Sequence, residues 1–194
     1  MPWWPSTKRW CVIATDKGWN LFVCGNGGSH TDAVHIVGEL SKSFERKRPI
    51  DPALAERMAH LPEGGVLAEF LESGLPSVAL GCNGALKSAV ENDIPAPGIA
   101  FAQELNVLAR AGDVLLAIST SGNARSCVMA LSVARAKDLT TAVLTGPAGG
   151  TMASEADIVL HAPGATTSIV QEAHVVLWHA MCQLIEAHYF TEPR

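Results

Sequence analysis

Short apolar runs alternate along the chain with longer segments of helical periodicity. Five of these runs predict buried strands, at Leu21–Cys24, Ser77–Leu80, Asp113–Ile118, Thr141–Leu144 and Ile158–Leu160. Apolar residues at helical spacing predict helices in the intervals, starting at Ser29 and covering 52–73, 85–91, 99–110, 124–136 and 166–188. Because strands and helices alternate, we expect a three-layer α/β fold with a five-stranded parallel sheet flanked by helices.

The same pattern indicates how the chain is divided. Residues 1–20 are an N-terminal Trp-rich segment without assignable structure, whose tryptophans pack either on the domain or on another subunit. Residues 21–194 are interpreted as a single domain with a helical insertion near 50–75, which Pro62–Gly65 splits into a hairpin or two short helices. Ser29 is the predicted N-cap of the first helix, which is expected to carry Phe44 on its apolar face and to end at Pro49 and Pro52.

The composition predicts a globular chain with neither a nucleic-acid nor a membrane partner. Of the 194 residues, 48% are hydrophobic and 17% are charged, and the net charge is −5 without a basic stripe. No apolar run approaches the roughly 18 residues of a membrane helix, and no signal peptide is apparent. Five scattered cysteines without a CxxC pair favour a reducing, cytoplasmic location over a disulfide framework.

Two turns rich in glycine and hydroxyl side chains follow predicted strands. Gly25–Ser29 comes after the first strand and Ser119–Asn123 after the third, and a helix follows each. Taken alone, the glycine turn is either an ordinary connection or a phosphate site, because it matches neither a P-loop nor GxGxxG. Ligands bind at the carboxyl ends of parallel strands, where both turns lie. Together, the backbone N–H groups and hydroxyls of the two turns favour a phosphorylated ligand.

Two helices carry candidate catalytic or metal-binding side chains. His35 and Glu39 lie about 40° apart on one helix face. They are interpreted in one of three ways: as an ordinary surface pair, as two ligands of a metal ion, or as a carboxylate base with a neighbouring histidine. On the last helix, Gln171 and His179 are about 80° and roughly 12 Å apart, so they are not an obvious chelating pair. His174 is an equal candidate for the functional histidine on spacing alone.

The motifs resemble those of the bacterial phosphoheptose isomerases, which are sugar isomerase (SIS) domain proteins. Residues 25–33, with the sequence GNGGSHTDA, and the following His35 and Glu39 resemble the first family motif. Residues 112–123, with the sequence GDVLLAISTSGN, are similar to the second, and further similarity lies at Leu144–Gly146, Gly149–Gly150, Ala156–Asp157 and Gln171–His174. The resemblance covers most of 21–188 and implies a flavodoxin-like SIS sheet.

The resemblance also implies an activity and the residues that carry it. The implied reaction converts sedoheptulose 7-phosphate into D-glycero-D-manno-heptose 7-phosphate through an enediolate, for the heptose of lipopolysaccharide. By position, Glu39 matches the catalytic base and His179 the catalytic acid. One zinc ion per subunit is implied at His35, Glu39, Gln171 and His179. The implied substrate-binding residues are Asn26, Gly27, Gly28, Ser29, Asp93, Ser119, Thr120, Ser121 and Gln171. Family members are homotetramers with sites at subunit junctions, so we expect a homotetramer or homodimer.

Departures from the family pattern keep two alternatives open. Ala124 stands where a serine is expected after the second turn, and Ser43, beside Lys42, stands where an arginine is expected. An isomerase for a different phosphosugar is therefore one alternative. The other is a non-catalytic SIS binding module, like the relative that binds the replication initiator DnaA and lacks the catalytic residues. The presence of both Glu39 and His179 favours an enzyme.

Overall fold

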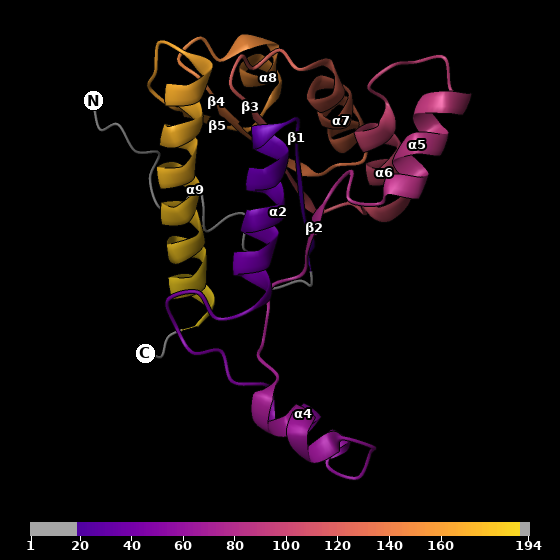
Figure 1. The fold of residues 1–194 in the computed structure, drawn as a ribbon, viewed down its shortest axis with the longest axis vertical. Helices are drawn as coiled ribbons and strands as arrows, with labels where there is room; N and C mark the ends of the chain where they lie inside the picture. The colour runs from indigo at the N-terminus through magenta and orange to yellow at the C-terminus, as the bar shows by residue number, and fades with distance from the viewer. Residues whose placement is uncertain (1–18, 191–194) are drawn as a thin grey trace.

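The computed structural model describes residues 19–190, which fold around one sheet (Figure 1). Its strands are β1 (Leu21–Gly25), β2 (Ser77–Ala79), β3 (Val114–Ser119), β4 (Thr140–Thr145) and β5 (Ile158–His161). They lie in the order β2-β1-β3-β4-β5, and every neighbouring pair is parallel. The expected α/β fold with a five-stranded parallel sheet is confirmed.

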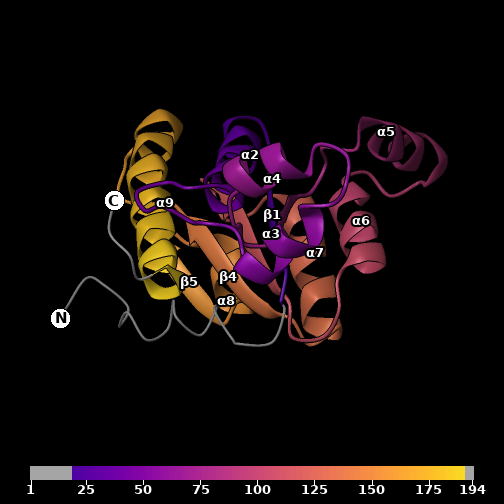
Figure 2. The ribbon, with the colours of Figure 1, turned by 90° about the horizontal axis from the view of Figure 1, so that it is seen from below.

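Helices cover both faces of the sheet. One face carries α2 (Gly28–Ser41) and α9 (Thr167–Tyr189), and the other carries α6 (Ala100–Leu108), α7 (Arg125–Ala136) and α8 (Gly150–Glu155). Figure 2 shows the sheet between α9 and α2 on one side and α7 and α8 on the other. Helix α5 (Gly84–Asp93) packs against α6 at the outer end of the second layer. Among the helices within residues 19–190, α8 alone was not predicted, because six residues give too short a periodic signal.

The alternation of side chains along each strand divides the core into two apolar clusters. Leu21 of β1 packs on the first face with Ile36 and Trp178, which come from α2 and α9. The next residue, Phe22, packs on the opposite face with Leu131 of α7. Both clusters are fully buried, so the sheet and its two helical layers form a rigid base for the loops at its edges.

Helix α2 begins earlier than the sequence pattern predicted. Its N-cap is Gly27, which has φ +55°, and Ser29 lies buried in the first turn with its N–H donating to the carbonyl of Asn26 at 3.1 Å. A positive φ is accessible to glycine at little cost, so the chain turns into the helix directly after Asn26. The prediction of Ser29 as the N-cap is therefore wrong.

Helix α2 also ends earlier than predicted, at Ser41, and Phe44 lies beyond it. The backbone N–H groups of Phe44 and Glu45 donate to the Glu186 carboxylate of α9, at 2.9 and 2.7 Å, instead of to helix carbonyls. A buried carboxylate that accepts such bonds competes with helix propagation. Residues 42–48 therefore form an irregular segment that links the end of α2 to α9.

The insertion contains two short helices, α3 (Pro52–Met58) and α4 (Gly64–Phe70). They pack on each other and extend below the sheet in Figure 1. In the Trp-rich segment, Trp19 packs on the domain, and its indole N–H donates to the Tyr189 hydroxyl at 3.2 Å. Residues 1–18 of that segment lie outside the described residues. No helix within residues 19–190 is both long enough and apolar enough to cross a membrane.

Candidate active site

The two predicted turns lie next to each other at one edge of the sheet. Gly25 ends β1 and is paired with Ile118 of β3, so the glycine turn and the Ser119–Asn123 turn start side by side. The chain leaves β1 for α2 on one face and leaves β3 for α7 on the other. This divergence is the topological switch point, the crevice in which open α/β sheets bind ligands. The structure thus brings together the turns that the sequence placed in a phosphate site.

The glycine turn is packed closely against the start of α9. A Cβ on Gly28 would lie 2.5 Å from the side-chain amide nitrogen of Gln171, so a larger residue at this position would displace the end of the Gln171 side chain. Gln171 therefore lies beside the glycine turn, at the sheet edge. The Asn26 side chain points across the crevice and donates to the Ser126 hydroxyl of α7 at 2.9 Å.

The second turn presents its hydroxyl groups to a small cavity. The hydroxyls of Ser119 and Ser121 are 3.4 Å apart, and the N–H of Asn123 donates to the Ser121 hydroxyl at 3.2 Å. Thr120 and Ser121 line a cavity of about 230 Å³, together with the start of α9 around Thr166 and Thr167. Hydroxyls next to a helix N-terminus form a neutral cradle suited to an anion.

Gly122 fixes the shape of this turn. Its φ is +66°, and a Cβ at this position would overlap the Gly149 carbonyl oxygen. We therefore expect Gly122→Ala to displace the 119–122 turn and to lower the unfolding free energy by about 1–3 kcal/mol. We also expect KM for a phosphosugar to rise by a larger factor than the factor by which kcat falls. Chemical denaturation and steady-state kinetics measure the two effects. Gly65→Ala, where a Cβ meets open space, is the control.

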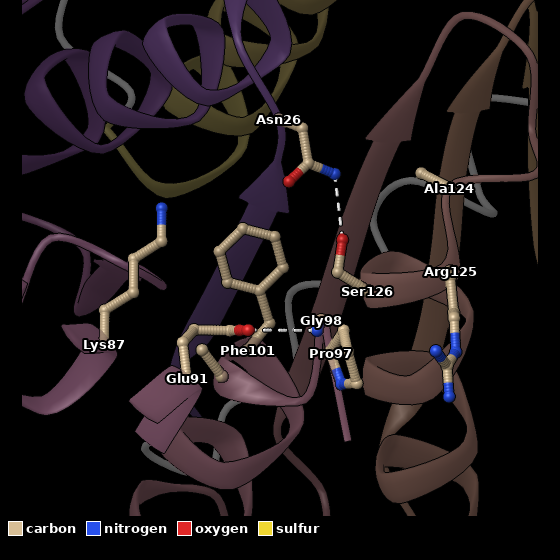
Figure 3. A pocket seen from close by; sticks show the side chains of 10 residues that line it. Asn26, Lys87, Glu91, Pro97, Gly98, Phe101, Ala124, Arg125 and Ser126 are labelled. Atoms are coloured by element: carbon tan, nitrogen blue, oxygen red, sulfur yellow. Dashed lines mark hydrogen bonds between the residues drawn. The ribbon is translucent and has the colours of Figure 1, made fainter. Parts of the chain in front are cut away.

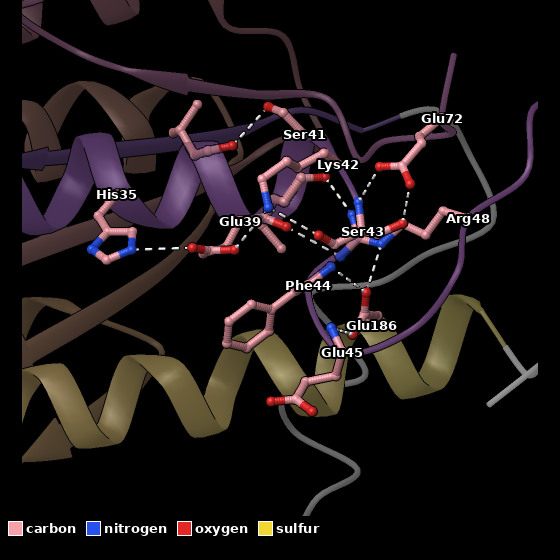
Figure 4. A network of polar contacts seen from close by, with 12 residues as sticks. His35, Glu39, Ser41, Lys42, Ser43, Phe44, Glu45, Arg48, Glu72 and Glu186 are labelled. Carbon is pink, nitrogen blue, oxygen red and sulfur yellow. Dashed lines mark hydrogen bonds and ion pairs between the residues drawn. The ribbon is translucent and has the colours of Figure 1, made fainter. Parts of the chain in front are cut away.

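A second group of candidate residues lies between α2 and α9, further from the sheet edge. His35 Nε2 is 3.1 Å from Glu39 Oε1 (Figure 4). The rings of His35 and His179 lie 5.6 Å apart. The Glu39 side chain is 15% exposed, and its Oε2 is buried without a hydrogen-bond partner among the described residues. Lys42 Nζ lies 3.7 Å from this oxygen, within ion-pair range but beyond a hydrogen bond. Glu39 therefore holds one carboxylate oxygen available for a proton or a cation.

Asp32 belongs to this group and was not singled out as a functional residue from the sequence. Partial burial raises the pKa of the Asp32 carboxyl, while the Trp178 indole and the imidazoles of His35 and His179 oppose the shift. Trp178 lies against both imidazoles, with ring centroids 4.7 Å from His35 and 3.8 Å from His179. Asp32 is one turn before His35, so helical spacing could have found it.

The two histidines of α9 are placed very differently. His174 is fully buried, both its ring nitrogens lack a hydrogen-bond partner among the described residues, and burial lowers its pKa. An imidazole enclosed in the core cannot reach a dissolved substrate. His179 is partly exposed. Its ring is stacked on that of Phe44, with centroids 5.8 Å apart, and it also contacts the His35 ring. The structure therefore favours His179 over His174 as the functional histidine.

The predicted site residues form two groups within one chain. The sheet-edge group contains the two turns and Gln171, and the inner group contains His35, Glu39 and His179. From Gly28 to Glu39 the helix rises by about 16 Å. Within residues 19–190, no three His, Cys, Asp or Glu side chains converge as a metal cage. Asp93, expected in a loop, is the last residue of α5, where it is exposed and accepts from Asn92.

A buried ion pair holds the end of α2 that carries Glu39. Arg48 Nε and Glu186 Oε1 are 2.8 Å apart, and both side chains are inaccessible (Figure 4). Arg48 also donates to the carbonyls of Leu40 at 2.7 Å and Glu39 at 3.1 Å, and its guanidinium lies 4.7 Å from the Phe190 ring centroid. Arg48 therefore binds two carbonyls at the end of α2, where intrahelical donors run out, and fixes the last turn of α2 against α9.

Comparison with known proteins identifies the family. A model of the SIS domain matches residues 95–188. The phosphoheptose isomerase of Alteromonas mediterranea is 34% identical over 182 residues, covering 92% of this chain and 79% of that protein. That of Roseiflexus sp. is 32% identical over 176 residues, covering 91% and 77%. The chain belongs to the phosphoheptose isomerase family.

The fold agrees with this assignment. The solved structure of phosphoheptose isomerase GmhA from Neisseria gonorrhoeae superposes with a TM-score of 0.72 at 30% identity, covering 92% of this chain and 82% of that one. The family resemblance seen in the motifs is thus confirmed, as is the prediction of an isomerase. Family membership agrees with the grouping of His35 and Glu39 of α2 with the His179 ring of α9.

Proposed function

We propose that this chain is an aldose–ketose isomerase whose substrate is sedoheptulose 7-phosphate and whose product is D-glycero-D-manno-heptose 7-phosphate. The observation that carries the proposal is the grouping of Glu39, His35 and His179 in a member of the phosphoheptose isomerase family. Isomerisation moves one proton between adjacent carbons and shifts the carbonyl. It therefore needs a base near carbon and an acid near oxygen, and Glu39 and His179 are of these two types.

The proposed chemistry assigns one role to each residue. The free oxygen of Glu39 takes the proton from C1 of the ketose, and the electron pair moves to give an enediolate. His179 stabilises the developing charge on the C2 oxygen by donating a proton or hydrogen bond. Glu39 then returns a proton to C2 while the C1 hydroxyl gives its proton back to His179, so that the C1 carbonyl forms and the aldose results. His35 holds Glu39 in place through their 3.1 Å contact. The hydroxyls of Ser119–Ser121 bind the phosphate.

Zinc is proposed as a cofactor on the chemistry of the donor groups. His35, Glu39 and His179 are ligands of the types that zinc prefers, and Glu39 Oε2 is a buried oxygen without a hydrogen-bond partner in the described chain. Gln171 lies in the sheet-edge group, so the proposed fourth donor would come from a neighbouring subunit, and a zinc ion held by these residues would polarise the substrate carbonyl. We expect His35→Ala to lower the zinc content of the purified protein, measured by elemental analysis. Zinc content equal to wild type in this variant would contradict the assignment.

Self-association is proposed from the spacing of the two groups. The helix rises by roughly 16 Å between Gly28 and Glu39, so the sheet-edge group and the inner group lie at different ends of α2. We propose that each site combines the phosphate turn of one subunit with Glu39 of another, in a homotetramer or homodimer. We expect two inactive variants, Ser121→Asp and Glu39→Gln, to regain activity when unfolded together and refolded as a mixture. Absence of activity in that mixture, with each variant folded, would place both groups of each site in one subunit.

The test of the proposed function is direct. Purified protein is incubated with sedoheptulose 7-phosphate, with and without added zinc, and aldose formation is followed. Other ketose phosphates of five, six and seven carbons are run in parallel to identify the preferred sugar. Turnover of the heptulose supports the full proposal, and turnover of another ketose phosphate alone revises the substrate. Binding without turnover of any ketose phosphate would contradict the isomerase assignment.

A further inference from the structure

Two buried thiols that the proposed mechanism does not use lie below the switch-point crevice. Side chains of β1 alternate between the two faces of the sheet, and Cys24 lies with Phe22 in the apolar cluster on the α7 face. Cys127, near the start of α7, belongs to the same cluster. Both cysteines are fully buried and carry free thiols. The packing therefore brings together two thiols that are 103 positions apart in the sequence.

Two contacts place the Cys127 sulfur beside the end of β1. It lies 3.8 Å from the Ile118 carbonyl oxygen of β3, and Ile118 is paired with Gly25, the residue that follows Cys24. It also lies 4.0 Å from the side-chain nitrogen of Asn26. The Cys127 sulfur is thus held against the two residues that come directly after Cys24, on the face of the sheet to which Cys24 points.

The surroundings make Cys127 the more reactive of the two thiols. Cys127 is the third residue of α7, where backbone N–H groups without intrahelical partners favour a negative charge. The interaction with the Cys24 thiol holds the pKa of the Cys127 thiol below its ordinary value, and Ser126 adds to this shift although burial opposes it. The same interaction raises the pKa of the Cys24 thiol, and burial raises it further. Cys127 is therefore the expected attacking sulfur.

A cavity leads from the surface towards this pair. It measures about 360 Å³, lies between α5, α6 and the start of α7, and has Asn26, Ala124 and Ser126 in its wall (Figure 3). Figure 3 shows Asn26 and Ser126 joined by their hydrogen bond of 2.9 Å. Ser126 precedes Cys127 in the chain, and the Asn26 amide contacts the Cys127 sulfur. A small oxidant in this cavity therefore meets the side chains that flank the Cys127 sulfur.

We propose that Cys24 and Cys127 form a redox modification site, at which hydrogen peroxide converts the two thiols into a reversible disulfide. The Cys127 sulfur attacks the peroxide, the O–O bond breaks, and the departing hydroxide takes up the proton that the thiol has lost, which leaves a sulfenic acid and water. The Cys24 sulfur then attacks the Cys127 sulfur. The S–S bond forms, the S–O bond breaks, and the oxygen leaves as a second water with the Cys24 proton. The two sulfurs lose one electron each, and the peroxide gains both.

The disulfide ties the glycine turn to α7. An S–S bond is about 2.05 Å long, much shorter than a contact between two thiols, so the segments that carry Asn26 and Ser126 have to move relative to each other. The expected effect on activity rests on the proposed function, in which Asn26 is a substrate-binding residue by family resemblance. Because a small misplacement of a binding group slows catalysis strongly, we expect oxidation to lower kcat/KM for a ketose phosphate about tenfold or more.

The test detects the bond itself, apart from turnover. Folded full-length protein is treated with hydrogen peroxide, its remaining thiols are alkylated, and its peptides are mapped by mass spectrometry without reduction. We expect a cross-linked peptide pair that contains Cys24 and Cys127 and disappears after treatment with dithiothreitol. Cys82→Ala and Cys182→Ala are the controls and keep the cross-link, because Cys82 is exposed and burial raises the pKa of Cys182 to about 12. Cys127→Ala is expected to lose it.

The outcomes separate this inference from the proposed function. A Cys24–Cys127 cross-link in the wild type upholds the site even if no ketose phosphate is turned over. Two alkylated thiols after peroxide treatment, or a cross-link to another cysteine, overturn the site even if the wild type is a good isomerase. In an active enzyme, the loss of kcat/KM is expected to be reversed by dithiothreitol and to be absent from Cys127→Ala. An equal loss in Cys127→Ala would overturn the effect of the bond on activity.

Discussion

Glu39→Gln is expected to lower kcat for ketose phosphate isomerisation by about 10²–10⁴-fold. The amide is nearly isosteric with the carboxylate and keeps an oxygen near His35, but it cannot accept a proton from carbon. Glu39 Oε2, the buried oxygen without a hydrogen-bond partner in the described chain, is the atom that loses its function. Steady-state kinetics with sedoheptulose 7-phosphate measure the effect, and KM is expected to change much less than kcat.

Two further variants make this prediction specific. His179→Ala removes the proposed acid and is expected to lower kcat strongly as well, since His179 is the accessible histidine of α9. Glu172→Gln is the control, because Glu172 is an exposed carboxylate on the same helix without an assigned role. Activity retained in both Glu39→Gln and His179→Ala would reject the site assignment.

Breaking the Arg48–Glu186 pair is expected to cause the largest loss of stability, about 3–5 kcal/mol of unfolding free energy. Arg48→Met leaves a buried carboxylate without its cation, and Glu186→Gln turns an amide NH₂ towards N–H donors of the 44–45 segment. Because Arg48 also binds the Glu39 carbonyl, both changes are expected to lower kcat in the protein that remains folded. Urea denaturation at pH 7 measures the stability.

An exposed ion pair supplies the matched control. Arg135 and Glu155 contact each other with side chains 55% and 43% exposed. Exposed pairs are screened by solvent and contribute about 0–1 kcal/mol, so Arg135→Met is expected to have a small effect. If Arg48→Met and Arg135→Met cost the same, the buried pair would not be the anchor of the α2–α9 junction.

The Glu186 carboxyl also predicts a pH dependence. Burial raises its pKa, but the N–H groups of Phe44 and Glu45 and the Arg48 guanidinium lower it more, so its pKa lies below the ordinary value of 4.5. A carboxyl whose pKa is lower in the folded state stabilises the fold above its unfolded pKa. That contribution is lost as the pH falls below about 4.5 and through the folded pKa. Unfolding free energies measured from pH 6 to pH 3 should therefore fall more steeply in wild type than in Glu186→Gln.

Much of the fold could be predicted from the sequence because its signals are local. The continuous apolar runs at β1 and β3 are typical of strands buried on both faces, and the glycine turn after β1 marks the sheet edge. The ends of α2 could not be predicted in the same way. Its start depends on the positive φ of Gly27, and its end depends on a carboxylate of α9 that lies 142 residues from Phe44. Such contacts leave no periodic signal.

In the candidate site, too, local pairs of residues could be predicted from the sequence, and contacts between distant segments could not. The pairing of His35 with Glu39 follows from their helical spacing, and the position of His179 beside them needed the packing of α9 on α2. Sequence spacing left His174 and His179 equal, and only burial distinguishes them. The buried Arg48–Glu186 pair joins distant segments, so it was not predictable from motifs.

The central claim is that Glu39 carries a proton between C1 and C2 of a phosphorylated ketose. The most direct measurement is the reaction of the wild-type protein with sedoheptulose 7-phosphate in D₂O, followed by NMR. The proposed mechanism predicts an aldose product that carries deuterium at C2 whenever the proton on Glu39 exchanges with solvent before it is returned, and neither product nor exchange with Glu39→Gln. Absence of both aldose and deuterium exchange in the wild type, with or without zinc, would contradict it.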